Sequence, residues 1–131
     1  MEARKIAVVG AAGRMGRILI RLVTESKEWT VSGALEREGY PSGQDAGVLA
    51  GMGELGVPVS DDVAACLDGA DIVVDFSAPS AVSRYVSLCV QRQIPFIEAT
   101  TALADGEQQA LEQAAGHCAV LQAANLSLGV Y

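Results

Sequence analysis

The chain has 131 residues, half of them hydrophobic and 19% charged, so one domain with a buried core is expected and an extensively disordered chain is excluded. Its 9 Lys and Arg residues face 16 Asp and Glu residues, a net charge of −7. This acidic balance, with no basic cluster, argues against nucleic acid or an anionic membrane as a partner. No apolar run approaches the roughly 20 residues that span a bilayer.

The cysteine and histidine content argues against a disulfide framework or a metal site. Cys66, Cys89 and Cys118 are far apart, no C-x-x-C pair exists, and His117 is the single histidine. We therefore expect no metal, a reducing cytoplasm as the compartment, and free cysteines that act as small core residues. His117 is expected at the surface or at a boundary.

The first part of the chain predicts a strand, a helix and a second strand. Residues 5–10 are an apolar run stopped by glycine, as in a strand buried on both faces. Apolar residues then recur at helical spacing up to about Ser26, and 29–35 predict another strand. The helix stripe expected to face the core comprises Met15, Ile18, Leu19, Leu22 and Val23.

Residues 39–56 are rich in glycine and predict a long excursion with one short helical turn, which we expect to be mobile. Residues 57–59 predict a short extended piece. Asp61 and Asp62 suit the start of a small helix that runs to Leu67, because negative charge is favourable at a helix N-terminus.

The second half alternates strands and helices. Residues 71–75 predict the clearest central strand, 95–97 and 119–121 two more, and Pro79 fits the first turn of the helix between the first two. A further helix is predicted over 107–115 and ends at Gly116. This alternation is typical of an α/β fold with right-handed crossovers and a parallel sheet covered on both faces. The predicted inner faces are Val82, Tyr85, Val86, Cys89 and Val90 on one helix and Ala110, Leu111 and Ala114 on the next.

A glycine turn joins the first strand to the first helix. Gly10 permits a sharp change of direction, Gly13 lets a diphosphate approach the backbone, and Gly16 allows close packing of helix on sheet. The helix N-terminus then offers N–H groups to phosphate. The second glycine is displaced by one from the G-x-G-x-x-G spacing, so the match is to a variant, and a tight turn without a ligand is the alternative.

An acidic residue closes the second strand. Glu36 can accept hydrogen bonds from both ribose hydroxyls of a dinucleotide, and Arg37 can receive a 2′-phosphate or stack on adenine. The pair leaves NADH and NADPH both possible. The alternative is a solvated charge cluster at a strand end.

At these positions the sequence resembles the dihydrodipicolinate reductase (4-hydroxy-tetrahydrodipicolinate reductase) family of lysine and diaminopimelate biosynthesis. The resemblance implies a Rossmann-type, doubly wound, mainly parallel sheet and hydride transfer from NADH or NADPH to a cyclic dicarboxylate. The matching stretches are Val9-Gly-Ala-Ala-Gly-Arg-Met-Gly16, Ala34-Leu-Glu-Arg-Glu38, Gln44-Asp-Ala-Gly47, Asp75-Phe-Ser77, Ala99-Thr-Thr101 and Ala123-Ala-Asn-Leu-Ser127.

The resemblance also implies a set of cofactor-binding residues. It implies that the turn lines the diphosphate, Glu36 binds the ribose, Arg37 meets the 2′-phosphate, and the remaining positions border the dinucleotide and its nicotinamide. The full set is Gly10, Ala11, Ala12, Gly13, Arg14, Met15, Glu36, Arg37, Phe76, Ser77, Ala99, Thr100, Thr101, Gln122, Ala123, Ala124 and Asn125. From chemistry alone, the two threonines could equally be helix-capping hydroxyls in a strand-end turn.

The chain departs from the family pattern in two ways. Ala99 and Ala102 replace the glycines of Gly-Thr-Thr-Gly, and Glu98 introduces a carboxylate whose charge we expect near the nicotinamide or the dicarboxylate. The family's substrate domain, which supplies the catalytic residues and forms the homotetramer, has no counterpart here. We therefore expect residues 1–131 to be a dinucleotide-binding domain without catalytic residues, with 126–131 starting a hinge, that binds cofactor without turnover.

Two other functions stay open. One is a non-enzymatic domain that senses NAD(H), and the other is the nucleotide half of another two-domain reductase such as an amino-acid dehydrogenase.

Overall fold

The computed structural model describes residues 3–41, 43–77, 81–99 and 105–122. Strands and helices alternate along the chain, as the sequence predicts. Within the described residues, no helix is both long and apolar enough to cross a membrane. The elements are β1 (Arg4–Val9), α1 (Arg14–Glu25), β2 (Trp29–Leu35), α2 (Ala46–Leu49), β3 (Val59–Ser60), α3 (Val63–Leu67), β4 (Ile72–Asp75), α4 (Val82–Arg92), β5 (Phe96–Glu98), α5 (Asp105–Ala114) and β6 (Val120–Gln122).

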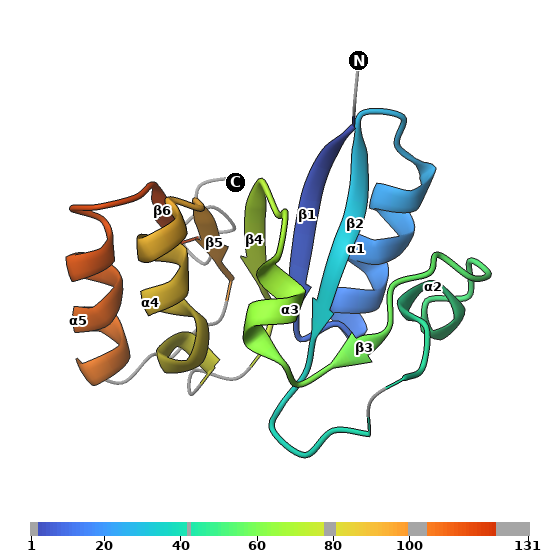
Figure 1. Cartoon of the computed structure of the whole chain (residues 1–131), viewed down its shortest axis with the longest axis horizontal. Coiled ribbons are helices and arrows are strands. Elements are labelled where there is room, and N and C mark those ends of the chain that lie inside the picture. The colour runs from blue at the N-terminus through green and yellow to red at the C-terminus, as the bar shows by residue number, and fades with distance from the viewer. Residues whose placement is uncertain (1–2, 42, 78–80, 100–104, 123–131) are drawn as a thin grey trace, which may run out of the picture.

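The strands form one parallel sheet in the order β3-β2-β1-β4-β5-β6 (Figure 1). From β1 the next strands, β2 and β3, are added on one side, and from β4 the next strands, β5 and β6, are added on the other side. The order of strand addition therefore reverses between the parallel neighbours β1 and β4. This is the Rossmann order, and ligands of such sheets bind at the carboxyl ends of the strands beside that reversal. The predicted fold class is therefore confirmed. The extended piece predicted over 57–59 overlaps the edge strand β3 only at Val59.

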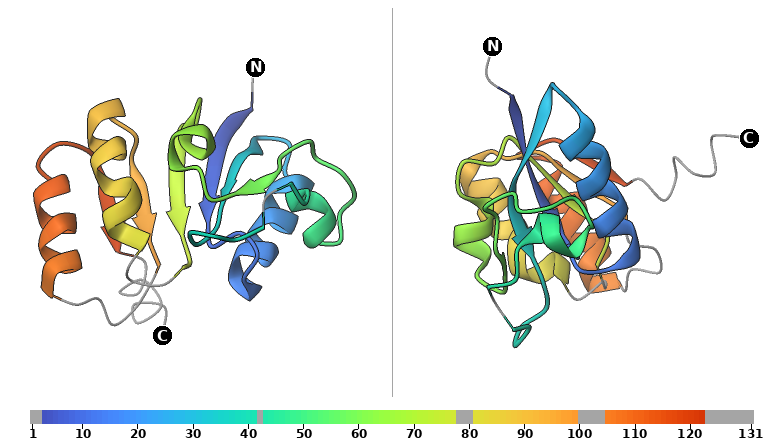
Figure 2. Two further views of the ribbon diagram at one scale, coloured as in Figure 1. Left: turned by 60° about the horizontal axis from the view of Figure 1, so that its bottom comes forward. Right: turned by 90° about the vertical axis from the view of Figure 1, so that its right-hand side faces the viewer.

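Helices cover both faces of the sheet, and each face has its own core. Successive strand residues point to opposite faces, so Val9 packs with the α3, α4 and α5 side, whereas Val8 packs with α1 and α2. Figure 2 shows α1 and α3 on opposite sides of the strands. Cys66 and Cys89 lie in the first core, where burial raises the pKa of their thiols to about 11 and about 12. The prediction that they are core residues is confirmed.

The predicted inner face of α1 is confirmed for Val23, which is buried, and for Leu19, which packs partly buried against the core, and it is wrong for the other three residues. Met15, Ile18 and Leu22 are 50%, 42% and 61% exposed, and the buried residues of the helix are Gly16, Ile20 and Val23. A Cβ on Gly16 would lie 2.1 Å from the carbonyl oxygen of Gly10. The close approach at this glycine decides which side of the helix faces the sheet, and apolar spacing alone does not reveal it.

The later helices bury the predicted residues. Tyr85 and Cys89 are fully buried on α4, and Leu111 and Ala114 are buried on α5. Val86 and Ala110 are partly buried against the same core. These inner faces are confirmed, and His117 is exposed, as expected.

The excursion between β2 and β3 is organised around Asp45, which caps α2. Its carboxylate accepts hydrogen bonds from five backbone N–H groups at 2.8–3.1 Å. Desolvation acts to raise the pKa of Asp45, but these hydrogen bonds outweigh it and hold the pKa below its usual value. The predicted helical turn is confirmed, while the mobility of the segment stays a prediction. The donors are Gly47, Val48, Leu55, Gly56 and Val57.

Candidate functional site

A cleft of about 700 Å³ opens at the carboxyl ends of β1, β2 and β4, beside the reversal in strand order. One wall is the turn between β1 and α1, and another is the segment that follows β2. The beginning of α4 lies opposite. Its lining residues are Val9, Gly10, Gly13, Glu36, Arg37, Glu38, Phe76, Ser77, Ala81, Ser83 and Arg84.

Two glycines of the turn are required by the protein itself. Gly10 has φ +83°, and a Cβ there would lie 2.9 Å from the backbone nitrogen of Ser77. Gly16 packs its Cα side against the Gly10 carbonyl, as described above. The fold explains both glycines, with or without a ligand.

Gly13 differs from its two neighbours. It has an ordinary φ of −75°, and an added Cβ would meet only the carbonyl oxygen of Gly10, at 3.4 Å. Gly13 lines the cleft and is the N-cap of α1, where it has no side chain to bond the N–H groups of the first turn. The backbone at the helix N-terminus is therefore open to a ligand, and the fold does not require glycine there.

Glu36 contacts the glycine turn directly. Its Oε2 accepts a hydrogen bond from the backbone N–H of Ala12 at 2.8 Å, and its Oε1 accepts one from the N–H of Arg37 at 3.2 Å. The two bonds hold the carboxylate at the tip of β2, where the sequence predicts a ribose-binding group.

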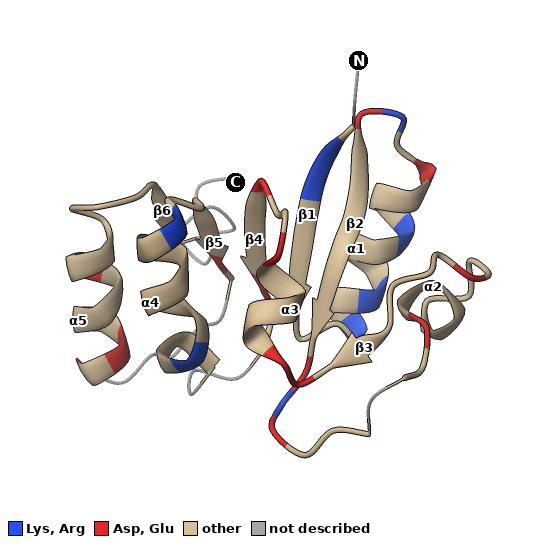
Figure 3. Ribbon diagram, in the orientation of Figure 1, with Lys and Arg blue, Asp and Glu red and all other residues tan. Residues whose placement is uncertain are grey.

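Two arginines border the same end of the cleft. The guanidinium of Arg37 lies 5.5 Å from the ring centre of Tyr40, a cation–π distance. Arg84 reaches from α4 and donates hydrogen bonds to the carbonyl oxygens of Glu36 and Asp61, both at 2.9 Å. Where the chain leaves β2, Glu36, Arg37 and Glu38 alternate in charge (Figure 3).

A buried polar group lies behind the β4 side of the cleft. The Oδ1 of Asp75 accepts hydrogen bonds from the backbone N–H and the hydroxyl of Ser77, at 2.7 and 2.5 Å. The hydroxyl of Tyr85 lies 2.8 Å from Asp75 Oδ2 and 2.5 Å from Glu98 Oε2. Burial, followed by the charges of these two carboxyls, raises the pKa of Tyr85 above its ordinary value, so its hydroxyl keeps its proton.

Several predicted site residues lie in the cleft, and others do not. Gly10, Gly13, Glu36 and Arg37 line it, as do the predicted Phe76 and Ser77. Ala11 is buried beneath the turn, while Arg14 and Met15 are exposed on the first turn of α1.

The remaining predicted residues follow β5 and β6. Ala99 is held by a hydrogen bond from its N–H to the carbonyl of Asp75 at 2.9 Å, and the side-chain amide of Gln122 pairs with that of Gln108. Glu98 is fully buried and is not among the residues that line the cleft, and its effect on a bound ligand stays a prediction. Thr100, Thr101, Ala123, Ala124 and Asn125 lie outside the described residues.

Sequence reasoning missed the contribution of α4. Ser83 and Arg84 line the cleft although they are distant in sequence from the glycine turn. The only signal in the sequence is their position in the helix that follows the central strand, which starts at the carboxyl edge of the sheet. That signal does not say which helix residues point toward the cleft.

The chain is similar in sequence to proteins of one enzyme family. The family described as "Dihydrodipicolinate reductase, N-terminus" matches residues 4–126. A 4-hydroxy-tetrahydrodipicolinate reductase of Beijerinckia indica is 42% identical over 131 residues, which cover 99% of this chain and 48% of that protein. The enzyme of the same name from Halorhodospira halophila is 41% identical over 126 residues, covering 95% and 47%. The chain thus spans about half the length of these relatives.

Solved structures agree on the fold. A dipicolinate-bound dihydrodipicolinate reductase from Paenisporosarcina superimposes with a TM-score of 0.65 at 20% identity, over 91% of this chain and 47% of that one. An amine dehydrogenase from Mycobacterium smegmatis gives 0.57 at 25% identity, over 87% and 37%. Together with the glycine turn, the strand order and the match over residues 4–126, these findings show that the chain belongs to the family of N-terminal domains of dihydrodipicolinate reductases.

Proposed function

We propose that the cleft binds NADH or NADPH, and that the chain is the cofactor-binding part of a 4-hydroxy-tetrahydrodipicolinate reductase of lysine biosynthesis. Gly13 carries the proposal. Neither the φ of this residue nor the atoms around it require a glycine. It lies at the N-terminus of α1, on the wall of the cleft. A diphosphate that contacts the backbone needs this absence of a Cβ.

Each wall of the cleft has a role in this proposal. The backbone from Gly10 to Met15 would hold the diphosphate, and Glu36 would accept hydrogen bonds from the adenosine ribose. The hydrogen bond from Ala12 holds the carboxylate beside the glycine turn, which suits that role. When bound, the cofactor supplies the hydride of the reaction.

Arg37 and Arg84 support binding of NADPH as well as NADH. A guanidinium binds phosphate through charge and paired hydrogen bonds. Arg84 uses two donors on carbonyl oxygens and, having five N–H groups, keeps others for a ligand. We expect Arg37→Gln and Arg84→Gln to weaken NADPH binding more than NADH binding.

The residues after β5 and β6, and the rest of the reaction, complete the proposal. Ala99 to Thr101 and Gln122 to Asn125 would border the nicotinamide. Reduction of the cyclic dicarboxylate would require a substrate domain and the homotetramer of the family, joined through residues 126–131, in the cytoplasm. The chain alone would bind the cofactor without turnover, and reduction of the substrate by the chain alone would disprove that part.

The test is calorimetric titration of the chain with NADH and NADPH. Gly13→Ala should weaken binding of both by about tenfold or more, about 1.4 kcal/mol, and leave the melting temperature close to that of the parent. Gly106→Ala is the matched control, because that glycine lies on α5 with nothing within 4 Å of an added Cβ. Failure of the parent chain to bind either coenzyme, or unchanged affinity in Gly13→Ala, contradicts the proposal.

A further inference from the structure

A tight turn follows β2 and brings Arg37 and Tyr40 together. The backbone N–H of Tyr40 donates a hydrogen bond to the carbonyl oxygen of Arg37 at 3.0 Å, so residues 37–40 form a β-turn. Gly39, the third residue of this turn, has φ +81°, the left-handed angle that a type II turn needs at that place. The first and fourth residues of a β-turn are close neighbours, so the turn places a cationic and an aromatic side chain next to each other.

The ring of Tyr40 restricts the position of the Arg37 guanidinium. The ring is partly buried against the core on the α1 side of the sheet. The guanidinium carbon lies 5.5 Å from the ring centre, within the range of a cation–π contact. Arg37 is exposed, and a long exposed side chain samples many rotamers unless a contact restricts it. Tyr40 therefore orders Arg37 before any ligand binds.

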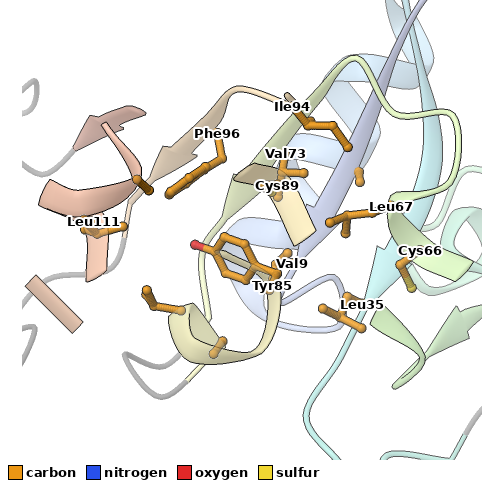
Figure 4. Close-up of a cluster of buried hydrophobic side chains, with 14 residues drawn as sticks. Val9, Leu35, Cys66, Leu67, Val73, Tyr85, Cys89, Ile94, Phe96 and Leu111 are labelled. Carbon is orange, nitrogen blue, oxygen red and sulfur yellow. The ribbon is translucent and has the colours of Figure 1, made fainter. Parts of the chain in front are cut away.

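The turn itself is held by several parts of the fold. Leu35, at the end of β2, is buried in the core on the other face of the sheet (Figure 4). The backbone N–H of Gly39 donates to the carboxylate of Asp61 at 3.0 Å. Arg84 donates from α4 to the carbonyl oxygens of Glu36 and Asp61, both at 2.9 Å. The turn is therefore fixed by β2, by α4 and by the segment that follows β3.

The guanidinium of Arg37 keeps its hydrogen-bond donors for a ligand. Among the described residues, none forms a hydrogen bond or an ion pair with this guanidinium. Its five N–H groups form a planar fork that matches the oxygens of a phosphate. Arg37 lines the cleft beside Glu36, at the end where the adenosine is proposed to bind. A 2′-phosphate is the group by which NADPH differs from NADH, so a cation at this place acts on one coenzyme alone.

We propose that Tyr40 is a positioning residue that raises the affinity of the cleft for NADPH relative to NADH, because its ring holds Arg37 where the guanidinium meets the 2′-phosphate. The proposal rests on the function proposed above and identifies what makes Arg37 selective. Because the side chain of Arg37 is ordered in advance, less conformational entropy is lost when the phosphate binds. NADH carries no phosphate there, so its binding gains nothing from the ring.

Stacking of Arg37 on adenine is the alternative, and it has a different consequence. A guanidinium also stacks on aromatic rings. Adenine is common to both coenzymes, so loss of Tyr40 would then weaken NADH and NADPH by the same factor. A general disturbance of the turn would also affect both. The ratio of the two affinities therefore separates a phosphate contact from these alternatives.

The chain contains a matched control pair at the other end of the same strands. The guanidinium carbon of Arg4 lies 5.5 Å from the ring centre of Trp29, the same distance as in the pair of Arg37 and Tyr40. Arg4 and Trp29 begin β1 and β2 and are register partners. The cleft lies at the carboxyl ends of these strands, so Trp29→Leu removes the same kind of contact away from the cleft.

Calorimetric titration with NADPH and NADH tests the selectivity. Tyr40→Leu should weaken NADPH binding about fivefold and change NADH binding by less than about twofold. Tyr40→Phe, which retains the ring, should restore the parent ratio of affinities, and Trp29→Leu should not alter it. If the parent binds both coenzymes and Tyr40→Leu leaves the ratio unchanged, this inference fails alone. If the parent binds neither coenzyme, the proposed function fails and this inference fails with it.

A double variant tests whether Tyr40 acts through Arg37. In the Arg37→Gln background the ring has no guanidinium to hold, so adding Tyr40→Leu should leave NADPH affinity within about twofold of that of Arg37→Gln. A further loss equal to that of Tyr40→Leu in the parent would show that the tyrosine acts by another route, and the proposal would be rejected.

The contact between the two side chains can also be measured without a ligand. In the ¹⁵N-labelled chain, the side-chain Nε–H signal of Arg37 is the one lost in Arg37→Gln. The ring current of Tyr40 should displace this signal, so it should move in Tyr40→Leu and keep its place in Tyr40→Phe. A signal that does not move in Tyr40→Leu would overturn the proposal, whichever coenzyme the chain binds.

Discussion

The glycine turn at residues 10–16 and the glycine-rich excursion at residues 39–56 use the same ingredients for different ends. The turn has one glycine in the left-handed region, Gly10, and the excursion has several, and each segment meets a carboxylate that accepts backbone hydrogen bonds. In the excursion, Asp45 accepts five such bonds, and Gly47 is needed because an added Cβ would lie 2.2 Å from the carbonyl of Gly53. These contacts all lie within the segment between β2 and β3.

The turn, in contrast, leaves groups directed at a cleft. Glu36 accepts backbone bonds from Ala12 and Arg37 and lines the cleft together with Gly13, whose lack of a side chain the fold does not require. The two segments therefore differ in what explains their glycines. Gly10 and Gly16 are explained by a positive φ or by a close backbone neighbour, whereas Gly13 has neither and lies on the wall of the cleft.

The largest loss of stability is expected at Gly16, a glycine that the packing of α1 on the sheet requires. Gly16→Ala places a Cβ 2.1 Å from the carbonyl of Gly10, so α1 must move away from the sheet. We expect the free energy of unfolding to fall by about 3 kcal/mol. Urea denaturation measures this, and a loss below about 1 kcal/mol would show that the close packing is not required.

Asp45→Asn tests whether the excursion depends on its carboxylate. The variant loses a charged acceptor of five N–H groups, and we expect a loss of about 2 kcal/mol at pH 7. Because the pKa of Asp45 is lowered in the folded protein, its contribution is complete above the unfolded value of about 3.9 and disappears as the pH falls through the folded pKa.

The difference in stability between the parent and Asp45→Asn should therefore be constant from pH 7 to pH 5 and shrink below about pH 4. Denaturation at several pH values provides the comparison. A difference that grows on acidification would have the wrong sign for this carboxylate.

The smallest effect is expected at Gly51, which has φ +79° and no atom within 4 Å of an added Cβ. Gly51→Ala adds only the cost of a left-handed conformation, about 1 kcal/mol. Gly51→Asn, which tolerates that conformation better, should recover part of the loss in the same thermal unfolding assay. An equal loss in both variants would mean that something other than φ makes glycine necessary here.

Much of the fold could be predicted from local pattern. The helix at 14–26 and the strand at 29–35 agree closely with the structure, because their lengths and apolar runs follow simple periods. The inner face of α1 could be predicted only in part: Val23 is buried as expected, but Met15, Ile18 and Leu22 are exposed, since the contact between Gly16 and Gly10 sets how the helix faces the sheet. The same limit concealed Arg84, which reaches the cleft only through the packing of α4.

The sequence alone predicted Gly10, Gly13, Glu36 and Arg37, all of which line the cleft, because turn chemistry and strand-end position constrain these residue types locally. Only the tertiary structure showed that Glu98 is buried against Tyr85, which also contacts Asp75. Residue spacing determines which elements form and in what order. The direction of a buried side chain depends on which partners from distant segments can satisfy its hydrogen bonds, and those partners meet only in the folded chain.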